Sequence, residues 1–225
     1  MNAGSNSDGY KEQGVTYPSG KMQKKLIELV FQDAKLDPLD VTYVETHGTG
    51  TRVGDPEECD GVARFFCDES NRKEPLLVGG VKSNMGHGES AAGLCGVAKI
   101  LIAMEAGMIP GNLHYQKPCP DIPALLDGRL KVVHKNTPWK AGLAVANAFG
   151  FGGSNGHVVL RRNMKEKVPP KAGHSTSKPR LVTVSGRTEE AVNTILDQVL
   201  STLTTQVHPR KIRLNLSYPA GREGS

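Results

Sequence analysis

The 225-residue chain lacks long apolar runs and has few cysteines and few aromatic residues. Apolar residues make up 37% of the sequence, and no stretch approaches the roughly 20 consecutive apolar residues that a membrane-spanning helix needs. The first residues are polar, without the basic and then apolar segments of a secretory leader. Four cysteines without a regular spacing favour reduced thiols over a disulfide framework. These absences predict a cytoplasmic protein with no membrane span.

Charge and ligand spacing argue against two further classes of function. The net charge is +5, but the basic residues are dispersed and aromatic residues make up only 5%, so we expect no nucleic-acid partner. A modest positive field instead suits an acidic protein partner or a phosphate-bearing substrate. No histidine and cysteine pair has the spacing of a zinc site, and we predict no metal.

Two glycine-flanked histidines stand out in the motifs Glu45-Thr-His-Gly-Thr-Gly-Thr51 and Val81-Lys-Ser-Asn-Met-Gly-His87. Each motif follows an apolar, strand-like stretch, and the glycines let the backbone approach a reacting group closely. Imidazoles on separate loops can converge on one oxyanion, where each preorganised donor is worth about 3 kcal/mol of barrier. We interpret the pair as a candidate carbon–carbon bond-forming site. Taken singly, either histidine has an ordinary alternative as a locally hydrogen-bonded loop residue.

Further motifs along the chain make it resemble the β-ketoacyl synthases of the thiolase superfamily. The resemblance is strongest to the ketosynthase region of animal-type multifunctional fatty acid synthase. The polyketide synthases share every catalytic motif and remain an alternative. The residues that carry the resemblance are Asn2 to Gly9, Lys11 to Gly14, His47 to Thr51, Gly54 to Glu57, Lys82 to His87, Pro110 to Leu113, Ile122 to Leu130 and Phe149 to Asn155.

The resemblance implies a decarboxylative Claisen condensation. In this reaction an acyl group on an active-site cysteine is attacked by the enolate released from malonyl on an acyl carrier protein. His47 and His87 would stabilise the enolate and handle its protons, and Lys82 would organise the second histidine electrostatically. The ordinary alternative for Lys82 is a solvated surface cation.

Three more residues acquire roles from the resemblance. Thr49 and Thr51 would hydrogen-bond the phosphopantetheine arm of the carrier protein, and no other cofactor is expected. Phe151 would gate the acyl pocket and supply a backbone N–H to the oxyanion hole. The alternatives are ordinary loop hydrogen bonding for the threonines and a core position for Phe151. His157, which follows the glycine-rich loop, is interpreted as structural.

The cysteine nucleophile of the family is missing. It belongs in a sharp turn well ahead of the histidine loop, whereas the four cysteines here are at other positions: Cys59, Cys67, Cys95 and Cys119. We interpret Cys95 as a small buried apolar residue. The chain is therefore expected to be the second half of a ketosynthase, inactive alone and partnered by the missing N-terminal half. The parent protein is expected to be a homodimer.

Alternating strand and helix patterns predict a parallel-rich α/β layer fold, the C-terminal half of a thiolase-like fold. Small residues at the start of the predicted helix at 90–107 suggest tight packing beneath the His87 loop. This helix is expected to be the longest. The predicted helices are 21–36, 55–66 and 90–107, and the predicted strands are 41–45, 76–81, 130–133, 143–148 and 157–160.

The predicted domains are a ketosynthase part at 1–162, a linker at 163–178, the start of a ketosynthase–acyltransferase linker domain at 179–206 and a tail at 207–225. The third region is a small α/β segment, with a strand at 179–185 and a helix at 188–203. Three interpretations of function stay open: part of a fatty acid synthase, the same region of a polyketide synthase, or a non-catalytic fragment that associates with full-length subunits.

Overall fold

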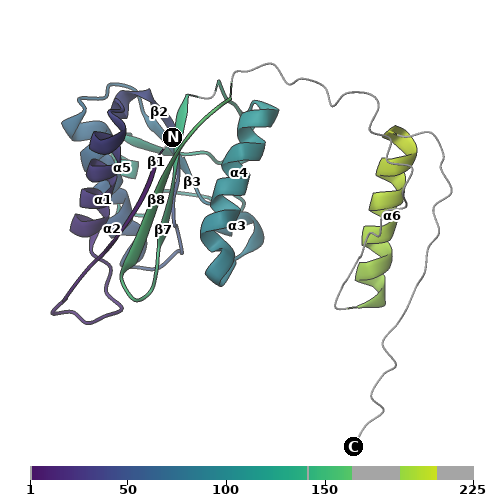
Figure 1. Ribbon diagram of the computed structural model, residues 1–225, viewed down its shortest axis with the longest axis horizontal. Coiled ribbons are helices and arrows are strands. Elements are labelled where there is room, and N and C mark those ends of the chain that lie inside the picture. The colour runs from purple at the N-terminus through teal and green to yellow at the C-terminus, as the bar shows by residue number, and fades with distance from the viewer. Residues whose placement is uncertain (1, 141, 164–187, 207–225) are drawn as a thin grey trace, which may run out of the picture. The chain divides into compact units, whose positions relative to one another are not determined.

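The computed structural model describes residues 2–140, 142–163 and 188–206. The chain divides into two compact units, 1–165 and 166–225. In the first unit six strands form one sheet with helices on both faces (Figure 1). The sheet order is β1-β8-β7-β2-β3-β5. The strands are β1 (Asn2–Ser7), β8 (Ser154–Arg161), β7 (Leu143–Phe149), β2 (Val41–Glu45), β3 (Leu76–Gly79) and β5 (Leu130–Val132).

The sheet is mixed. Strands β7, β2, β3 and β5 run parallel to one another, whereas β8 pairs antiparallel with both β1 and β7. Strand β7 is buried along most of its length, as expected for a strand covered on both faces. Two short strands, β4 (Met108–Ile109) and β6 (Thr137–Pro138), form a separate antiparallel pair.

Two helices cover one face of the sheet. α1 (Gly20–Ala34) begins where the Ser19 hydroxyl accepts the N–H of Met22, and ends at Lys35 in the left-handed conformation. α2 (Gly54–Ala63) continues into a π-helical segment, η2 (Arg64–Glu69). Their apolar faces pack with the sheet in a core that contains Phe31, Val62 and Phe66.

α4 (Ala92–Ala106) covers the opposite face, where Ile100 and Met104 pack with Tyr43 and Trp139 in a second core. Small residues bring the start of α4 close to the sheet, because a Cβ on Gly93 would lie 3.2 Å from the Cβ of Ala148. The predicted tight packing is therefore present. The remaining short helices are η1 (Pro38–Asp40), α3 (Lys82–Met85), η3 (Glu89–Ala91) and α5 (Pro123–Leu126).

The predicted α/β class is confirmed, with differences at element ends. The strand predicted at 76–81 stops at Gly79, because Val81 and Lys82 begin α3. The helix predicted at 90–107 is not the longest, since α6 (Glu189–Gln206) has 18 residues and α4 has 15. The sequence pattern does not predict β1, whose polar residues show no apolar alternation and which is held by backbone pairing with β8.

In the second unit the structure describes α6, which agrees with the helix predicted at 188–203. The predicted strand at 179–185 and tail at 207–225 lie outside the described residues, as does all of the predicted linker except Asn163. The predicted domain division therefore stays a prediction. Among the described residues, no helix combines the length and apolar content that crossing a bilayer requires.

Candidate active site

The candidate site lies where two neighbouring parallel strands send their connections to opposite faces of the sheet. β2 leads into α2, which packs on the same face as α1, whereas β3 leads through α3 into α4 on the other face (Figure 1). Such a divergence opens a crevice at the carboxyl ends of the strands. His47 follows β2 and Lys82 follows β3, so both lie at this crevice.

The two predicted histidines come together. The ring centroids of His47 and His87 lie 5.8 Å apart, and the ring planes are inclined at 84°. The ring of Phe149, the last residue of β7, lies 6.2 Å from that of His47. Two loops separated by 40 residues of sequence therefore bring their imidazoles to one place, as the motif spacing predicts.

Hydrogen bonds at the Nδ1 atoms set the direction in which each imidazole can donate. The backbone N–H of Glu89 donates to His87 Nδ1 over 2.8 Å, so this nitrogen carries no proton. The Nζ of Lys82 lies 3.5 Å from His47 Nδ1 and is a donor only. We therefore assign the proton of each neutral ring to Nε2. Burial first, and then the positive charge of Lys82, lower the pKa of His47 to about 4, which keeps that ring neutral.

Lys82 contacts the first histidine. Its ammonium group donates to the backbone carbonyl oxygen of His47 and lies beside the Nδ1 of the same residue. The resemblance implies that Lys82 organises His87, so the partner found in the structure differs from the expected one. Burial lowers the pKa of Lys82, and the carboxylates of Glu58 and Glu45 oppose that shift.

Glu58 is a residue of the site that the sequence reasoning missed. Its carboxylate accepts the backbone N–H of His47 at 2.7 Å and that of Gly48 at 2.9 Å. Burial raises the pKa of Glu58 to about 7, against the opposing effect of these hydrogen bonds. One signal was available in the sequence: Val62, four residues later in the predicted helix, is apolar, and residues four apart share a helix face.

A buried chain of polar groups continues from Glu58 along the sheet face that α1 and α2 cover. Asn147 Nδ2 donates to Glu58 Oε1 at 2.9 Å, and the Oδ1 of Asn147 lies 2.7 Å from His157 Nδ1. Because Asn147 uses its amide nitrogen for Glu58, its oxygen accepts from His157. His157 is fully buried, and burial lowers its pKa to about 3. Its interpretation as a structural histidine agrees with these contacts.

The two predicted threonines face different partners. The Thr51 hydroxyl accepts the N–H of Gly54 at 3.1 Å and so holds the start of α2. Thr49, whose Oγ1 lies 3.3 Å from that of Thr51, lines a cavity of about 380 Å³ that Lys82 and Asn112 also line. Of the two hydroxyls, Thr49 is therefore the one placed beside an open volume.

Phe151 lies in the turn between β7 and β8 and is 82% exposed. A core position for this side chain is therefore wrong. Phe149 is the aromatic residue of this segment that reaches His47. The turn is anchored at Gly153, whose carbonyl oxygen accepts the N–H of Asp8 at 2.8 Å.

The cysteines have no disulfide partners, and their burial differs from one to the next. Cys59 and Cys67 are buried, and burial raises the pKa of both thiols, which disfavours the nucleophilic thiolate. Cys95 is half-buried, so its predicted full burial is wrong. Among the described residues, no group of three or more histidine, cysteine and acidic side chains is placed to bind a metal ion.

Comparisons with known proteins agree with this geometry. Residues 1–116 match the C-terminal domain of the β-ketoacyl synthases, and residues 118–216 match the ketoacyl-synthetase C-terminal extension. The chain therefore belongs to the β-ketoacyl synthase family. Among solved structures, a ketosynthase from module 6 of the bacillaene synthase of Bacillus subtilis 168 is 28% identical, with a TM-score of 0.71 over 91% of this chain and 35% of that chain. The thiolase-like fold of these ketosynthases is thus present here.

Both kinds of synthase occur among the relatives. The highly reducing polyketide synthase sor1 of Hypocrea jecorina is 35% identical over 96% of this chain and 9% of its own length. A fatty acid synthase of the goose Anser anser anser is 54% identical over 48% of this chain and 30% of its own length. The chain thus spans about a tenth of the first relative and under a third of the second.

Proposed function

We propose that this chain supplies the malonyl-decarboxylating part of a β-ketoacyl synthase. The observation that carries the proposal is the meeting of His47 and His87 at 5.8 Å, with Lys82 beside the first ring. The match to the β-ketoacyl synthase family over residues 1–116, which contain all three residues, supports it.

In the proposed reaction the bond between the malonyl carboxylate and the adjacent carbon breaks and carbon dioxide leaves. The electron pair moves into the thioester, forming an enolate whose oxygen carries the negative charge. The Nε2–H groups of His47 and His87 bind this oxygen, and each such donor is worth about 3 kcal/mol of barrier. Neutral rings suit this role because they donate without an exchange of protons.

The enolate carbon then attacks the acyl thioester on a cysteine sulfur, and the carbon–sulfur bond breaks to release the thiolate. We place this cysteine outside the 225 residues, because the family nucleophile precedes the histidine loop and all four cysteines here follow His47. Burial also raises the pKa of the Cys59 and Cys67 thiols. Thr49 holds the pantetheine arm beside its cavity, Thr51 supports the loop, and Phe151 gates the acyl pocket from its exposed turn.

The substrates follow from the same proposal. Malonyl and acyl groups arrive as thioesters on the phosphopantetheine of an acyl carrier protein, and the net charge of +5 favours an acidic carrier. We also propose that the parent protein is a cytoplasmic homodimer. The relatives are synthases of fatty acids and polyketides, which supports the carrier-bound substrate class.

Within the family we propose an animal-type fatty acid synthase as the parent protein. The identity of 54% to the goose fatty acid synthase supports this choice. A polyketide synthase is the second candidate, because the 35% identity to sor1 extends over 96% of the chain. The product of the full synthase decides between them: a saturated fatty acid supports the first candidate and a polyketide the second.

A non-catalytic, associating fragment is the third candidate. α4 exposes Leu94, Leu101 and Ile102 at 73%, 51% and 67%, and such apolar clusters favour association. Analytical ultracentrifugation of the purified chain tests this candidate. Self-association, or binding to a full-length subunit, supports this candidate. A stable monomer that does not bind full-length subunits rules it out.

The test of the main proposal uses the purified 225-residue chain and malonyl-pantetheine, with acetyl-pantetheine as the control that lacks the carboxylate. We expect malonyl-pantetheine to shift the imidazole ¹⁵N resonances of His47 and His87 but not that of the exposed His134. Adding hexanoyl-pantetheine should give no β-ketoacyl product. Unmoved resonances would contradict the binding role, and product formation by the chain alone would contradict the missing nucleophile.

A further inference from the structure

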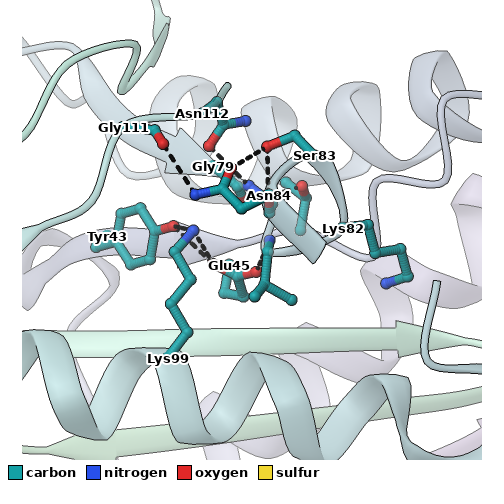
Figure 2. A network of polar contacts seen from close by, with 12 residues as sticks. Tyr43, Glu45, Gly79, Lys82, Ser83, Asn84, Lys99, Gly111 and Asn112 are labelled. Carbon is teal, nitrogen blue, oxygen red and sulfur yellow. Dashed lines mark hydrogen bonds and ion pairs between the residues drawn. The ribbon is translucent and has the colours of Figure 1, made fainter. Parts of the chain in front are cut away.

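A buried charged cluster lies next to the candidate site but touches neither histidine ring. Glu45, the last residue of β2, forms an ion pair with Lys99 of α4, with Oε2 and Nζ 2.8 Å apart. Tyr43 bridges the pair: its hydroxyl donates to Glu45 Oε2 at 2.7 Å and accepts from Lys99 Nζ at 2.8 Å. Figure 2 shows Tyr43 and Lys99 on one side of Glu45 and Lys82 on the other.

The cluster is almost completely closed to water. Glu45 is 1% exposed and Lys99 is 7% exposed, although a lysine on a surface helix normally extends into solvent. Gly96 makes the approach of α4 to the pair feasible, because a Cβ there would lie 3.1 Å from Glu45 Cγ. Buried ion pairs contribute little net stability compared with apolar residues of similar size, so stability alone does not account for this one.

The second carboxylate oxygen of Glu45 reaches the segment that carries Lys82. Glu45 Oε1 accepts the backbone N–H of Val81 at 2.5 Å. Val81 is the N-cap residue of α3 and directly precedes Lys82. A hydrogen bond to an ionised acceptor is roughly twice as strong as a neutral one, so this carboxylate fixes the start of α3 firmly.

Two further contacts hold the same segment from its other side. The Oδ1 of Asn112 accepts the N–H of Gly80 at 3.2 Å, and the Ser83 hydroxyl donates to the Gly80 carbonyl at 2.9 Å (Figure 2). Both are contacts between neutral groups. The Glu45 carboxylate therefore supplies the charged contact to Val81, and Lys99 compensates its buried charge.

We propose that Glu45 and Lys99 are positioning residues that hold Val81 so that the ammonium group of Lys82 stays against His47. The proposal rests on the proposed function of His47 and Lys82 and adds two residues to that site. Neither residue touches the reacting atoms. They act by fixing the backbone on which Lys82 is carried, and Lys82 in turn holds Nδ1 of His47 as an acceptor.

The double variant Glu45→Gln/Lys99→Met separates positioning from folding. It removes both charges together, so no unpaired charge is left buried, and the glutamine oxygen can still accept a weaker hydrogen bond from Val81. We expect the variant to fold, with a far-ultraviolet circular dichroism spectrum like that of the unchanged chain. We expect Lys82 to move away from His47, so that the pKa of His47 in a ¹⁵N titration rises toward the ordinary value of about 6.5.

Lys24→Met is the control, because Lys24 forms ion pairs with Glu28 and Glu69 away from the two catalytic loops. It should leave the titration of His47 unchanged. A folded double variant with an unchanged His47 titration overturns the proposal. If the double variant does not fold, Tyr43→Phe decides, because it removes only the bridging hydroxyl. A smaller rise in the pKa of His47 then supports the proposal, and no rise overturns it.

This readout needs no substrate. A failure of malonyl-pantetheine to bind would therefore reject the proposed function without changing the titration result. Conversely, an unchanged pKa of His47 in the folded double variant would reject the positioning role of Glu45 and Lys99 without affecting the proposed function.

Discussion

The carboxylate of Glu58 accepts the backbone N–H of His47 at 2.7 Å, so a buried acid on α2 holds the loop that carries the first imidazole. The same group accepts from Gly48 and from Asn147, and it is 3% exposed. Its removal would leave backbone donors without a partner at the base of the candidate site.

Glu58→Gln is expected to lower the free energy of unfolding by roughly 1–3 kcal/mol, the cost of leaving a buried donor unpaired. The N–H groups of His47 and Gly48 are bound by different oxygens of Glu58, and in glutamine one of these positions is an NH2 group, which cannot accept. Urea denaturation measures the change. Glu74→Gln, at an exposed position, is the control and should be neutral. Equal midpoints for the two variants would show that Glu58 does not hold the loop.

The two histidine-loop motifs illustrate what the sequence could reveal. His47 and His87 each follow an apolar strand, and adjacent parallel strands end at the same sheet edge, so their meeting follows from the pattern. The sequence pattern does not predict that Lys82 contacts His47, because the direction of a side chain after Gly80 depends on how α3 begins. The sequence therefore indicates which groups are present but not how they pair.

Other residues of the site were hidden for different physical reasons. Lys99 lies in an apolar helix pattern, where a single lysine is typical of a solvent-exposed position. Its ion pair with Glu45 forms only when α4 packs on the sheet. Strand β1 is polar because its pairing with β8 uses backbone groups. Phe149 and Phe151 are two residues apart, and strand alternation alone does not say which turn residue leaves the sheet.

These two phenylalanines give a matched pair of variants. Phe149 is 7% exposed, so Phe149→Ala should lower the free energy of unfolding by about 3 kcal/mol or more, as for other buried aromatic residues. Phe151, at 82% exposed, should tolerate alanine with a change within about 0.5 kcal/mol. Thermal and urea denaturation of both variants tests the assignment. A large loss for Phe151→Ala would show that its turn is packed rather than open.

Gly96→Ala should be destabilising although it lies within a helix. Alanine in place of glycine normally favours a helix by about 1 kcal/mol. Here the added Cβ would lie 3.1 Å from the Cγ of Glu45, so the buried ion pair must move. Ala98→Gly on the same helix measures the ordinary difference in helix propensity and should lower the free energy of unfolding by about 1 kcal/mol. A gain in stability for Gly96→Ala would show that α4 can move away from Glu45 freely.

His157 gives a pH-dependent prediction. Burial lowers its pKa to about 3 in the folded chain from an ordinary 6.5, so the unfolded chain binds the proton more tightly. The contribution of the neutral His157 to the free energy of unfolding is complete above pH 6.5. It is lost as the pH falls toward 3, at about 1.4 kcal/mol per pH unit. His157→Gln should remove this slope between pH 6.5 and 4. The effect must be separated from Glu58, whose raised pKa of about 7 gives the opposite slope above pH 4.5.

Urea denaturation across this pH range measures the slope directly. His134→Gln, at an exposed position, should keep the slope of the unchanged chain. A His157→Gln variant with the same slope as the unchanged chain would mean that His157 is protonated without cost in the folded state.

The proposed pair of imidazole donors is tested most directly by the position of the ring protons of His47 and His87 in the free chain at pH 7. Selective ¹⁵N labelling of histidine reports separately on Nδ1 and Nε2 of each ring. We expect His47 to be neutral, because its pKa is lowered to about 4. We also expect no proton on the Nδ1 of either ring, because these atoms accept from Lys82 in His47 and from the Glu89 N–H in His87. An imidazolium at His47, or a proton on either Nδ1, would contradict the proposal that both rings direct Nε2–H donors to the same oxyanion.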